Sequence, residues 1–293
     1  MFKASYLVIL FDKRPELSLT LNTILSSGND YTDCSLVVWS NGPNSIKNEL
    51  SYLNKFKKIG FSVDFYETTG NESLAKIYNY FIENYDSERY VLLDDDSTLN
   101  SDYLVGSMNS HPSYVSVPLI KHGGEIEGPI LNGKVCTQLG PIPEEQRFVA
   151  IGSGLIIGKG LVKKVKQRYS ELFDENFYLY AVDTTFFYRL FKIGANVDIN
   201  VINGFEHSLS RLNKDSDPIS GFRKKERTYA ILLTALHYSK YPKLKIIKLL
   251  LVDLRKLILR TPTDLDLKAS LFFVFDKKHY RCSNNKEVTK IEI

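Results

Sequence analysis

The segment YVLLDDDSTL, residues 90–99, places Asp94, Asp95 and Asp96 directly after an apolar run. The run is short and rich in strand-forming residues, so it predicts a β-strand that ends where the carboxylates begin. In an extended chain residues i and i+2 point to the same side, so Asp94 and Asp96 can face one ligand while Asp95 faces away. Two carboxylates on one side suit Mg²⁺ or Mn²⁺. The alternative is an acidic turn that caps the strand or the next helix.

Strand-like and helix-like segments alternate upstream of these aspartates. Short apolar runs that predict strands lie at residues 5–11, 34–40, 60–67 and 89–93. Segments with helical spacing lie between them, at residues 15–28, 43–56 and 71–85. This alternation predicts an α/β fold with a mostly parallel sheet and helices on both faces. Such sheets bind ligands at the carboxyl ends of their strands, which is where the aspartates lie.

The pattern is less regular after residue 100. Gly and Pro gather at residues 118–143 and predict hairpins or a mobile loop that closes over a site. A glycine-rich strand is expected at residues 148–160, and helices at 161–169 and 181–194, before a strand at 195–202. Beyond Arg223 the spacing is helical, with breaks at Pro242 and Pro262. We expect a catalytic domain over residues 1–220 and a basic helical extension over residues 221–293.

Charge is distributed unevenly along the chain. The net charge is +4, but residues 221–293 hold 17 Lys and Arg against 7 Asp and Glu, a net charge of +10. Within this extension, residues 241–260 combine basic and apolar side chains at helical spacing, which suits an anionic membrane surface. The alternative is a helix that packs on the catalytic domain with its basic side in solvent. Nucleic acid binding is not expected, because no recognised motif accompanies the charge.

The remaining composition bears on the cellular compartment. Cys34, Cys136 and Cys282 are odd in number and widely spaced, which argues against a disulfide framework or a zinc–thiolate site and favours a reducing cytoplasm. No stretch approaches the roughly 20 apolar residues that a membrane-spanning helix needs. A soluble or surface-bound protein is therefore expected.

Two further residues are candidates for chemistry. Asp183 opens a predicted helix, where a carboxylate is either an ordinary capping residue or a general base for a hydroxyl proton. His207 follows an apolar strand, where a histidine is either structural or a third ligand beside two carboxylates.

Taken in order, these pieces resemble a known family. An N-terminal βαβ region is followed by D-x-D after an apolar strand, by GSGLIIGKG, by FDENFYLYAVDTTFFYRLFKIGA and by a strand ending in His. This order is similar to that of the inverting GT-A glycosyltransferases of family 2, and especially of the bacterial rhamnosyl- and galactofuranosyltransferase branch, which builds surface polysaccharides such as O-antigen and capsule. The resemblance covers about residues 5–210.

The resemblance implies a role for each matching residue. Asp94, Asp96 and His207 match a site for Mn²⁺ or Mg²⁺ on the donor diphosphate, and Asp183 matches the general base. The residues that match the donor-nucleotide site are Phe11, Asp12, Asn41, Asn71, Asn79 and Asp95. The donor would be a UDP- or dTDP-sugar and the acceptor a glycan or lipid-linked glycan. The enzyme would then work in the cytoplasm, on the inner face of the cytoplasmic membrane.

Two departures from the family pattern affect the donor site. Ser40 and Asn41 stand where Asp-Asn or Asp-Asp is usual, and Ser73 stands where Gly is usual. Both changes bear on the contacts that select the nucleotide.

Two other interpretations of the same residues stay open. The segment VLLDDDST also resembles the haloacid dehalogenase-like phosphohydrolases, in which Asp94 would be the nucleophile and Asp96 the acid/base. Those enzymes carry the motif on their first strand and need G-D-x-x-x-D, which this sequence lacks. The third interpretation is a non-catalytic sugar-nucleotide-binding protein.

Overall fold

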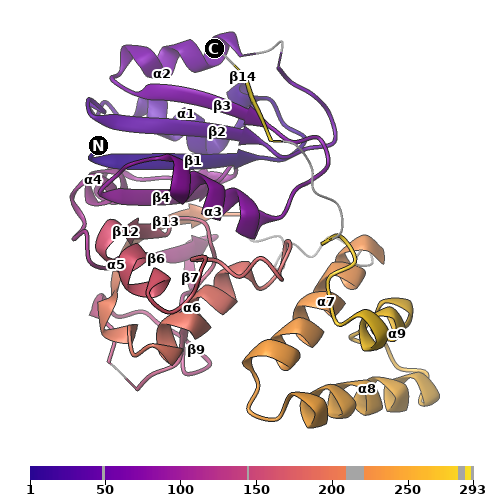
Figure 1. Ribbon diagram of the computed structural model, residues 1–293. Helices are drawn as coiled ribbons and strands as arrows, with labels where there is room; N and C mark the ends of the chain where they lie inside the picture. Colours follow the sequence, from indigo (N-terminus) through magenta and orange to yellow (C-terminus); the bar gives the residue numbers. More distant parts are fainter. Residues whose placement is uncertain (48–49, 144, 209–220, 283–287, 292–293) are drawn as a thin grey trace.

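The structure, a computed structural model, describes residues 1–47, 50–143, 145–208, 221–282 and 288–291. Its centre is a large sheet, and it has the predicted α/β class (Figure 1). The strands of the main sheet are β1 (Ala4–Leu10), β2 (Cys34–Ser40), β3 (Ser62–Glu67), β4 (Arg89–Asp94), β5 (Ser97–Thr98), β6 (Val115–His122), β7 (Glu125–Gly128), β10 (Gly140–Pro141), β12 (Ile156–Gly158), β13 (Ile199–His207) and β14 (Thr289–Ile291). A small second sheet holds β8 (Ile130–Leu131), β9 (Lys134–Val135) and β11 (Phe148–Val149).

The order across the main sheet is β10-β13-β6-β12-β4-β1-β2-β3-β14. The four predicted strands β1 to β4 pair in parallel with one another, and β13 pairs in parallel with β6. β12 lies between β4 and β6 and is antiparallel to both. Consequently the carboxyl ends of β1, β2, β3 and β4 lie side by side, and Asp94 stands among them at the end of β4.

Helices cover both faces of the sheet. They are α1 (Leu19–Ser26), α2 (Asn54–Lys58), α3 (Leu74–Asn84), α4 (Ser101–Asn109), α5 (Lys159–Lys166) and α6 (Val182–Lys192), with short 3₁₀ turns at Pro15–Leu17, Ser51–Leu53 and Asn196–Asp198. Side chains of β1 alternate between two hydrophobic cores: Leu7 and Ile9 pack with α3, α5 and α6, and Tyr6 and Val8 pack with α1, α2 and α4. This alternation follows from the two-residue repeat of a strand. Every residue of β1 and β2 is buried, which explains why both strands are mostly apolar.

Three segments differ in detail from the expectation. The helix expected at residues 43–56 is a 3₁₀ turn followed by the short α2. The strand expected at residues 148–160 is divided into β11 and β12, because Gly154 adopts a φ of +89° between them. Residues 118–143 form hairpins, the first of the two predicted alternatives, in which β6 pairs with β7 and β8 pairs with β9. The segment begins, however, with the buried end of strand β6, so part of it lies in the core.

The extension consists of α7 (Gly221–Tyr238), α8 (Pro242–Ile258) and α9 (Leu267–Asp276), and the helix break expected at Pro242 is where α8 begins. α7 contributes Tyr229, Leu232 and Leu233 to the core that also holds α3 and α6. Beyond the helices, β14 pairs with β3 at the edge of the main sheet, a strand that the sequence did not predict. The predicted boundary after residue 220 falls at the end of residues 209–220, outside the described residues. Within the described residues, no helix is both long and apolar enough to cross a membrane.

Candidate active site

Asp94, Asp96 and His207 lie together at the carboxyl end of β4. One ligand atom from each of the three lies within 4.8 Å of the others. Asp94 is the last residue of β4, and Asp96 stands in the turn before β5. His207 arrives from the far end of the chain, because β13 pairs antiparallel with β5 and sets His207 opposite Ser97. The structure therefore brings together the three residues of the predicted metal site.

Two serine hydroxyls bond to each other and to the residues of this cluster. Ser97 Oγ lies 2.9 Å from His207 Nδ1 and 3.2 Å from Ser153 Oγ. Ser153 Oγ in turn accepts a hydrogen bond of 3.0 Å from the backbone N–H of Asp94. Gly154 makes this approach feasible, since a Cβ there would lie 2.6 Å from Pro118 Cγ and 2.7 Å from a Phe205 ring carbon. The GSG triplet is thus a close-packing feature beside the carboxylates.

Within the described residues, burial and like charges shift the pKa values of all three groups of the cluster. Burial and the neighbouring carboxylates of Asp96, Asp95 and Asp183 raise the pKa of Asp94 to about 7. Burial also raises the pKa of Asp96, although His207 opposes the shift, and burial lowers the pKa of His207. The solvent-exposed fraction is 44% for the Asp94 side chain and 7% for His207, so the cluster opens toward solvent on the carboxylate side.

The donor set fits a divalent cation. Asp96 Oδ1 is buried and accepts no hydrogen bond within the described residues, although His207 Nδ1 lies 3.3 Å away. His207 Nε2 lies 3.9 Å from Asp94 Oδ2. Two carboxylates and an imidazole form a mixed oxygen and nitrogen set that suits Mn²⁺ and accommodates Mg²⁺.

Asp95 points away from the cluster, as expected from its place between the two other aspartates. Its carboxylate accepts a hydrogen bond of 2.7 Å from Lys13 Nζ and one of 3.3 Å from the backbone N–H of Phe11. The Lys13 ammonium neutralises this carboxylate and ties the loop after β1 to the loop after β4. Asp95 thus holds in place the backbone on which Phe11 and Asp12 stand.

Asp183 lies in the first turn of α6 and shares a cavity with the cluster. The cavity has a volume of about 380 Å³, and Asp94, Asp183 and His207 line it together with Tyr180 and Arg227. Asp183 Oδ1 accepts a hydrogen bond of 2.7 Å from the N–H of Thr184. Burial raises the pKa of Asp183, and this hydrogen bond opposes the shift. A carboxylate with a raised pKa that faces a cavity is suited to accept a proton.

A second cavity adjoins the first along the extension. Its volume is about 500 Å³, and Tyr180 and Arg227 line both cavities. The other side chains that line it include Ile231 of α7 and Lys245 and Leu249 of α8. We call it the α7–α8 groove.

The loop after β1 presents two of the predicted donor-binding residues. Phe11 is 54% exposed, and Asp12 has a φ of +50° and accepts a hydrogen bond of 2.7 Å from Asn44 Nδ2. Gly42 packs against this loop, since a Cβ at that position would lie 2.6 Å from the Asp12 backbone nitrogen. The exposed Phe11 ring stands at the carboxyl end of β1, where a planar base could stack.

Three predicted donor-binding asparagines are largely engaged within the protein. The Asn41 side chain is buried and bonds to both the N–H and the C=O of Glu72, at 2.6 and 2.9 Å. The Asn79 side chain is also buried and holds Phe173 through its N–H and C=O, each at 2.9 Å. Asn71 has a φ of +51°, and its C=O accepts a hydrogen bond from Arg281. Direct donor contacts of these residues remain a prediction.

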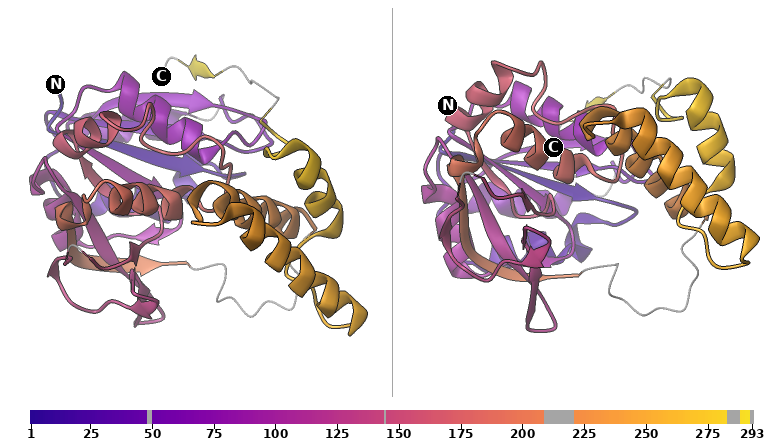
Figure 2. Two further views of the ribbon diagram at one scale, coloured as in Figure 1. Left: turned by 60° about the horizontal axis from the view of Figure 1, so that its bottom comes forward. Right: turned by 90° about the horizontal axis from the view of Figure 1, so that it is seen from below.

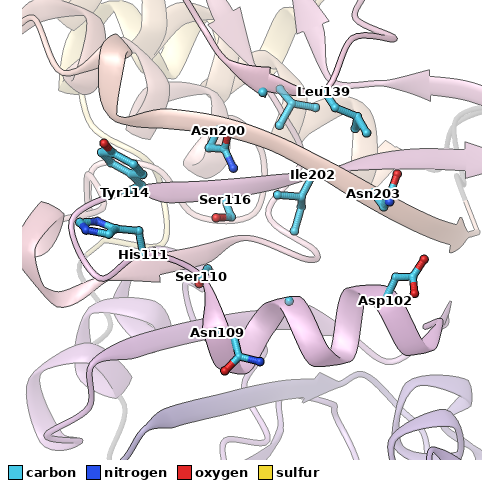
Figure 3. A pocket seen from close by; sticks show the side chains of 13 residues that line it. Asp102, Asn109, Ser110, His111, Tyr114, Ser116, Leu139, Asn200, Ile202 and Asn203 are labelled. Carbon is cyan, nitrogen blue, oxygen red and sulfur yellow. The ribbon is translucent and has the colours of Figure 1, made fainter.

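A larger cavity lies elsewhere in the described residues. It has a volume of about 550 Å³ and is lined by residues of α4, β6 and β13 that do not include the acidic cluster or Asp183. Figure 3 shows this cavity between α4, which carries Asp102 and Asn109, and β13, which carries Asn200 and Asn203. We place the candidate site in the smaller cavity because the carboxylates with raised pKa values converge there.

Sequence reasoning missed four residues of this site: Lys13, Ser97, Ser153 and Arg227. Lys13 follows the first predicted strand, and Ser153 stands between two glycines, so position and local pattern were available as signals. No local pattern marks the other two residues. Ser97 meets His207 of the distant strand β13. Arg227 lines the cavity with Tyr180, which lies before α6.

Comparison with known proteins identifies the fold. No known family profile matches the sequence, and no curated protein matches it significantly. Among solved structures, S. aureus TarS 1–349 is similar with a TM-score of 0.51 and 16% identity, over 85% of this chain and 79% of that chain. The same TarS region in complex with UDP has a TM-score of 0.55 and 18% identity, over 87% of this chain and 72% of that chain. In complex with UDP-GlcNAc it has a TM-score of 0.54 and 16% identity, over 87% of this chain and 73% of that chain. The likeness shows the fold, which is the GT-A type of α/β glycosyltransferase fold.

Proposed function

We propose that this chain is a metal-dependent, inverting glycosyltransferase that moves a sugar from a nucleotide diphosphate donor to a hydroxyl of a glycan acceptor. The observation that carries the proposal is that Asp94, Asp96 and His207 cluster at the carboxyl end of β4, and that Asp94 and His207 of this cluster line one cavity with Asp183. The UDP and UDP-GlcNAc bound to TarS support a nucleotide-sugar donor, and a UDP-sugar in particular.

The acidic cluster serves the leaving group. Asp94, Asp96 and His207 would hold Mn²⁺ or Mg²⁺, which as a Lewis acid neutralises the negative charge of the departing nucleotide diphosphate. The buried Asp96 Oδ1, which accepts no hydrogen bond in the described residues, supports this role. Ser97 orients the imidazole through Nδ1, and Ser153 holds the Asp94 backbone in place.

Asp183 serves the attacking group. In this role its carboxylate removes the proton from the acceptor hydroxyl as the oxygen attacks the anomeric carbon from the face opposite the leaving group. A single displacement of this kind inverts the anomeric configuration. Phe11 would stack on the nucleotide base, while Lys13 and Asp95 keep the Phe11 loop fixed relative to β4.

The proposal also covers the glycosyltransferase family, the class of acceptor and the location in the cell. The order of motifs favours family 2 and its rhamnosyl- and galactofuranosyltransferase-like branch, with a dTDP-sugar as the other donor class. A lipid-linked glycan of bacterial surface polysaccharide synthesis is the acceptor class that this branch implies. Work on such an acceptor places the enzyme in the cytoplasm at the inner membrane surface, with contact through residues 241–260.

Calorimetric titration of UDP- and dTDP-sugars, with and without Mn²⁺, tests the donor and the metal together. For the wild-type protein we expect donor binding that strengthens at least tenfold with Mn²⁺, since the cation neutralises diphosphate charge. Asp96→Ala should abolish this gain. Asp102→Ala, in the cavity between α4 and β13, is the matched control and should bind as the wild type does. Equal binding with and without Mn²⁺, or a loss in Asp102→Ala rather than Asp96→Ala, would contradict the proposal.

A further inference from the structure

Helix α8 is apolar on two opposite faces. Its inner face packs Ile246, Leu249 and Leu250 against the core that holds α7. Its outer face carries a second stripe whose members are three or four residues apart and therefore lie along one line of the helix. These side chains, 48–73% exposed, are Leu244, Ile247, Leu251, Leu254 and Ile258. In the part of the chain that the structure describes, the inner face attaches the helix to the protein, and the outer stripe has no apolar contact that accounts for it.

Helix α9 repeats this arrangement. Ala269 and Phe273 face inward and join the same core. The outward side chains follow the i, i+4, i+7, i+8 spacing of one helix face and are Leu267, Leu271, Val274 and Phe275. Phe275 is 76% exposed, more than any other large apolar side chain in the described residues. Figure 2 shows α8 and α9 at the end of the molecule away from the sheet.

Exposed apolar surface is concentrated in this one region. The described residues hold 27 exposed large apolar side chains, of which 15 lie between residues 241 and 280. Scattered apolar residues are normal on a protein surface, but a contiguous group of this kind marks an interaction site. We call the outward stripes of α8 and α9 the docking face.

The charges around the docking face indicate what it meets. On the helix surface, Lys243 borders the α8 stripe on one side and Lys248 and Arg255 border it on the other. Asp253 is the single acidic residue of α8, and it is 3% exposed and turned inward, where it accepts hydrogen bonds from the N–H groups of Asp264 and Leu265. A second copy packed face to face would set lysines against lysines. An anionic lipid surface instead complements both the apolar stripe and its basic margins.

We propose that the docking face seats on an anionic lipid bilayer by inserting the outer side chains of α8 and α9 into the interface. Insertion of apolar side chains supplies the binding energy, and the basic margins add attraction for anionic headgroups. This extends the contact expected for residues 241–260 to α9, and it makes the apolar side rather than the basic side the contacting surface. The proposal does not depend on sugar transfer.

The docking face is continuous with the candidate active site through α8. Lys245 and Leu249 belong to α8 and also line the α7–α8 groove, which shares Tyr180 and Arg227 with the cavity of Asp183. A bilayer at the docking face would therefore lie at one end of a groove whose other end adjoins the candidate base.

Vesicle co-sedimentation tests the proposal on the full chain. The probes are vesicles of phosphatidylcholine alone and of phosphatidylcholine with phosphatidylglycerol, each at low and high salt. We expect binding to the anionic vesicles that weakens but persists at high salt, because salt screens charge and not apolar insertion. Leu251→Ser and Phe275→Ser, both at exposed positions, should each weaken binding about tenfold, as expected when a large apolar side chain is removed from the interface. Leu139→Ser and Val197→Ser, exposed apolar positions elsewhere, are the matched controls.

Several results would overturn the proposal. Binding that high salt abolishes completely would indicate adsorption by charge alone. Absence of vesicle binding would reject the bilayer, and if Leu251→Ser and Phe275→Ser then abolish a dimer seen by light scattering, a second copy covers the face. Donor titration on the same variants should match the wild type, so a failure of docking is distinguished from a failure of the proposed activity.

Discussion

Asp183 is the residue on which the distinction between an enzyme and a binding protein depends. A capping carboxylate needs only to accept hydrogen bonds from backbone N–H groups, and Asp183 does accept one from Thr184. A base must also face the reacting hydroxyl, and Asp183 lines the same cavity as Asp94 and His207. The N-cap residue of α6 is Ala181, and the Thr184 N–H bonds to Asp183 Oδ1. Both roles can coexist in one side chain, because a carboxylate has about four acceptor sites and can take a proton beside such a bond.

We predict that Asp183→Asn slows donor turnover by about 10²–10⁴-fold, the usual contribution of a general base, with donor affinity unchanged. Released UDP measures turnover, and calorimetry measures affinity. Because burial raises the pKa of Asp183, the base becomes protonated at a higher pH than an ordinary aspartate. The acid limb of the wild-type kcat profile should therefore lie above about pH 4, the ordinary aspartate range.

Asp102→Asn is the control for this prediction, since Asp102 lies outside the cavity of Asp183. Wild-type protein that binds donor and shows no turnover with any acceptor would favour the non-catalytic interpretation. A turnover rate that survives in Asp183→Asn while the melting temperature falls would reduce Asp183 to a capping residue.

At the scale of elements, the segment after α9 connects the extension to the loop before α3. Glu226 of α7 is 1% exposed and lies 3.3 Å from His279 Nε2, and it accepts a hydrogen bond of 2.7 Å from the Tyr280 hydroxyl. Arg281 lies 3.7 Å from the same carboxylate and donates to the C=O groups of Gly70 and Asn71. One buried carboxylate thus ties α7 to the strand-to-helix connection that holds Asn71, one of the predicted donor-binding residues.

We predict that Glu226→Gln lowers the free energy of unfolding at neutral pH by about 3 kcal/mol, the scale for breaking a buried ion pair. Burial alone would raise the pKa of Glu226, but its hydrogen bonds and ion pairs with His279, Tyr280 and Arg281 lower it below the ordinary value. A carboxyl with a lowered pKa stabilises the fold above its unfolded-state pKa, and this contribution is lost as the pH falls through its folded-state pKa. The difference between wild type and Glu226→Gln should therefore shrink in acid.

Denaturant unfolding at neutral pH and at a pH below the ordinary glutamate range measures this difference. Glu125→Gln, on the exposed β7 hairpin, should show neither effect. A constant difference between Glu226→Gln and wild type at all pH values would show that the carboxylate carries no charge-dependent stabilisation.

Some strands and helices could be predicted from the sequence, and others could not. The strands β1 to β4, α3 and the aspartates at the end of β4 have local signals of periodicity and composition, and the parallel arrangement follows from their alternation. The position of β12 between β4 and β6 has no local signal, because it depends on pairing over more than 60 residues. Asn41 and Asn79 illustrate the same limit in the site, since their partners lie 31 and 94 residues away. A side chain that holds backbone cannot be told from one that binds ligand without those partners.

At the scale of the whole molecule, the extension is part of the core rather than an appendage. Tyr229, Leu232 and Leu233 of α7 are buried with α3 and α6, and β14 covers the edge of β3. Uncovered sheet edges and apolar faces favour aggregation.

We predict that a chain of residues 1–220 aggregates or unfolds at a much lower temperature than the full chain. Loss of the three core side chains of α7 alone removes roughly 5 kcal/mol or more, against a total stability of about 5–15 kcal/mol for a typical domain. Gel filtration and thermal unfolding measure the outcome. A chain of residues 1–282, which keeps α7 to α9 and lacks β14, should unfold at a temperature between those of the 1–220 fragment and the full chain. A monomeric, cooperatively folding 1–220 fragment would instead establish the predicted boundary as a true domain boundary.

The return of the chain through β14 has one more consequence. In Figure 1 β14 lies beside β3 at one edge of the sheet, and α8 and α9 lie at the opposite side of the molecule. Two described attachments of the extension, α7 in the core and β14 on β3, favour a fixed position over a hinged one. If α8 and α9 rest on a membrane, the cavity of Asp183 then stands at a constant height above the lipid. Under the proposed function, the distance between lipid and cavity would then select the acceptor. A glycan long enough to bring its hydroxyl to that distance would react, and shorter glycans would not.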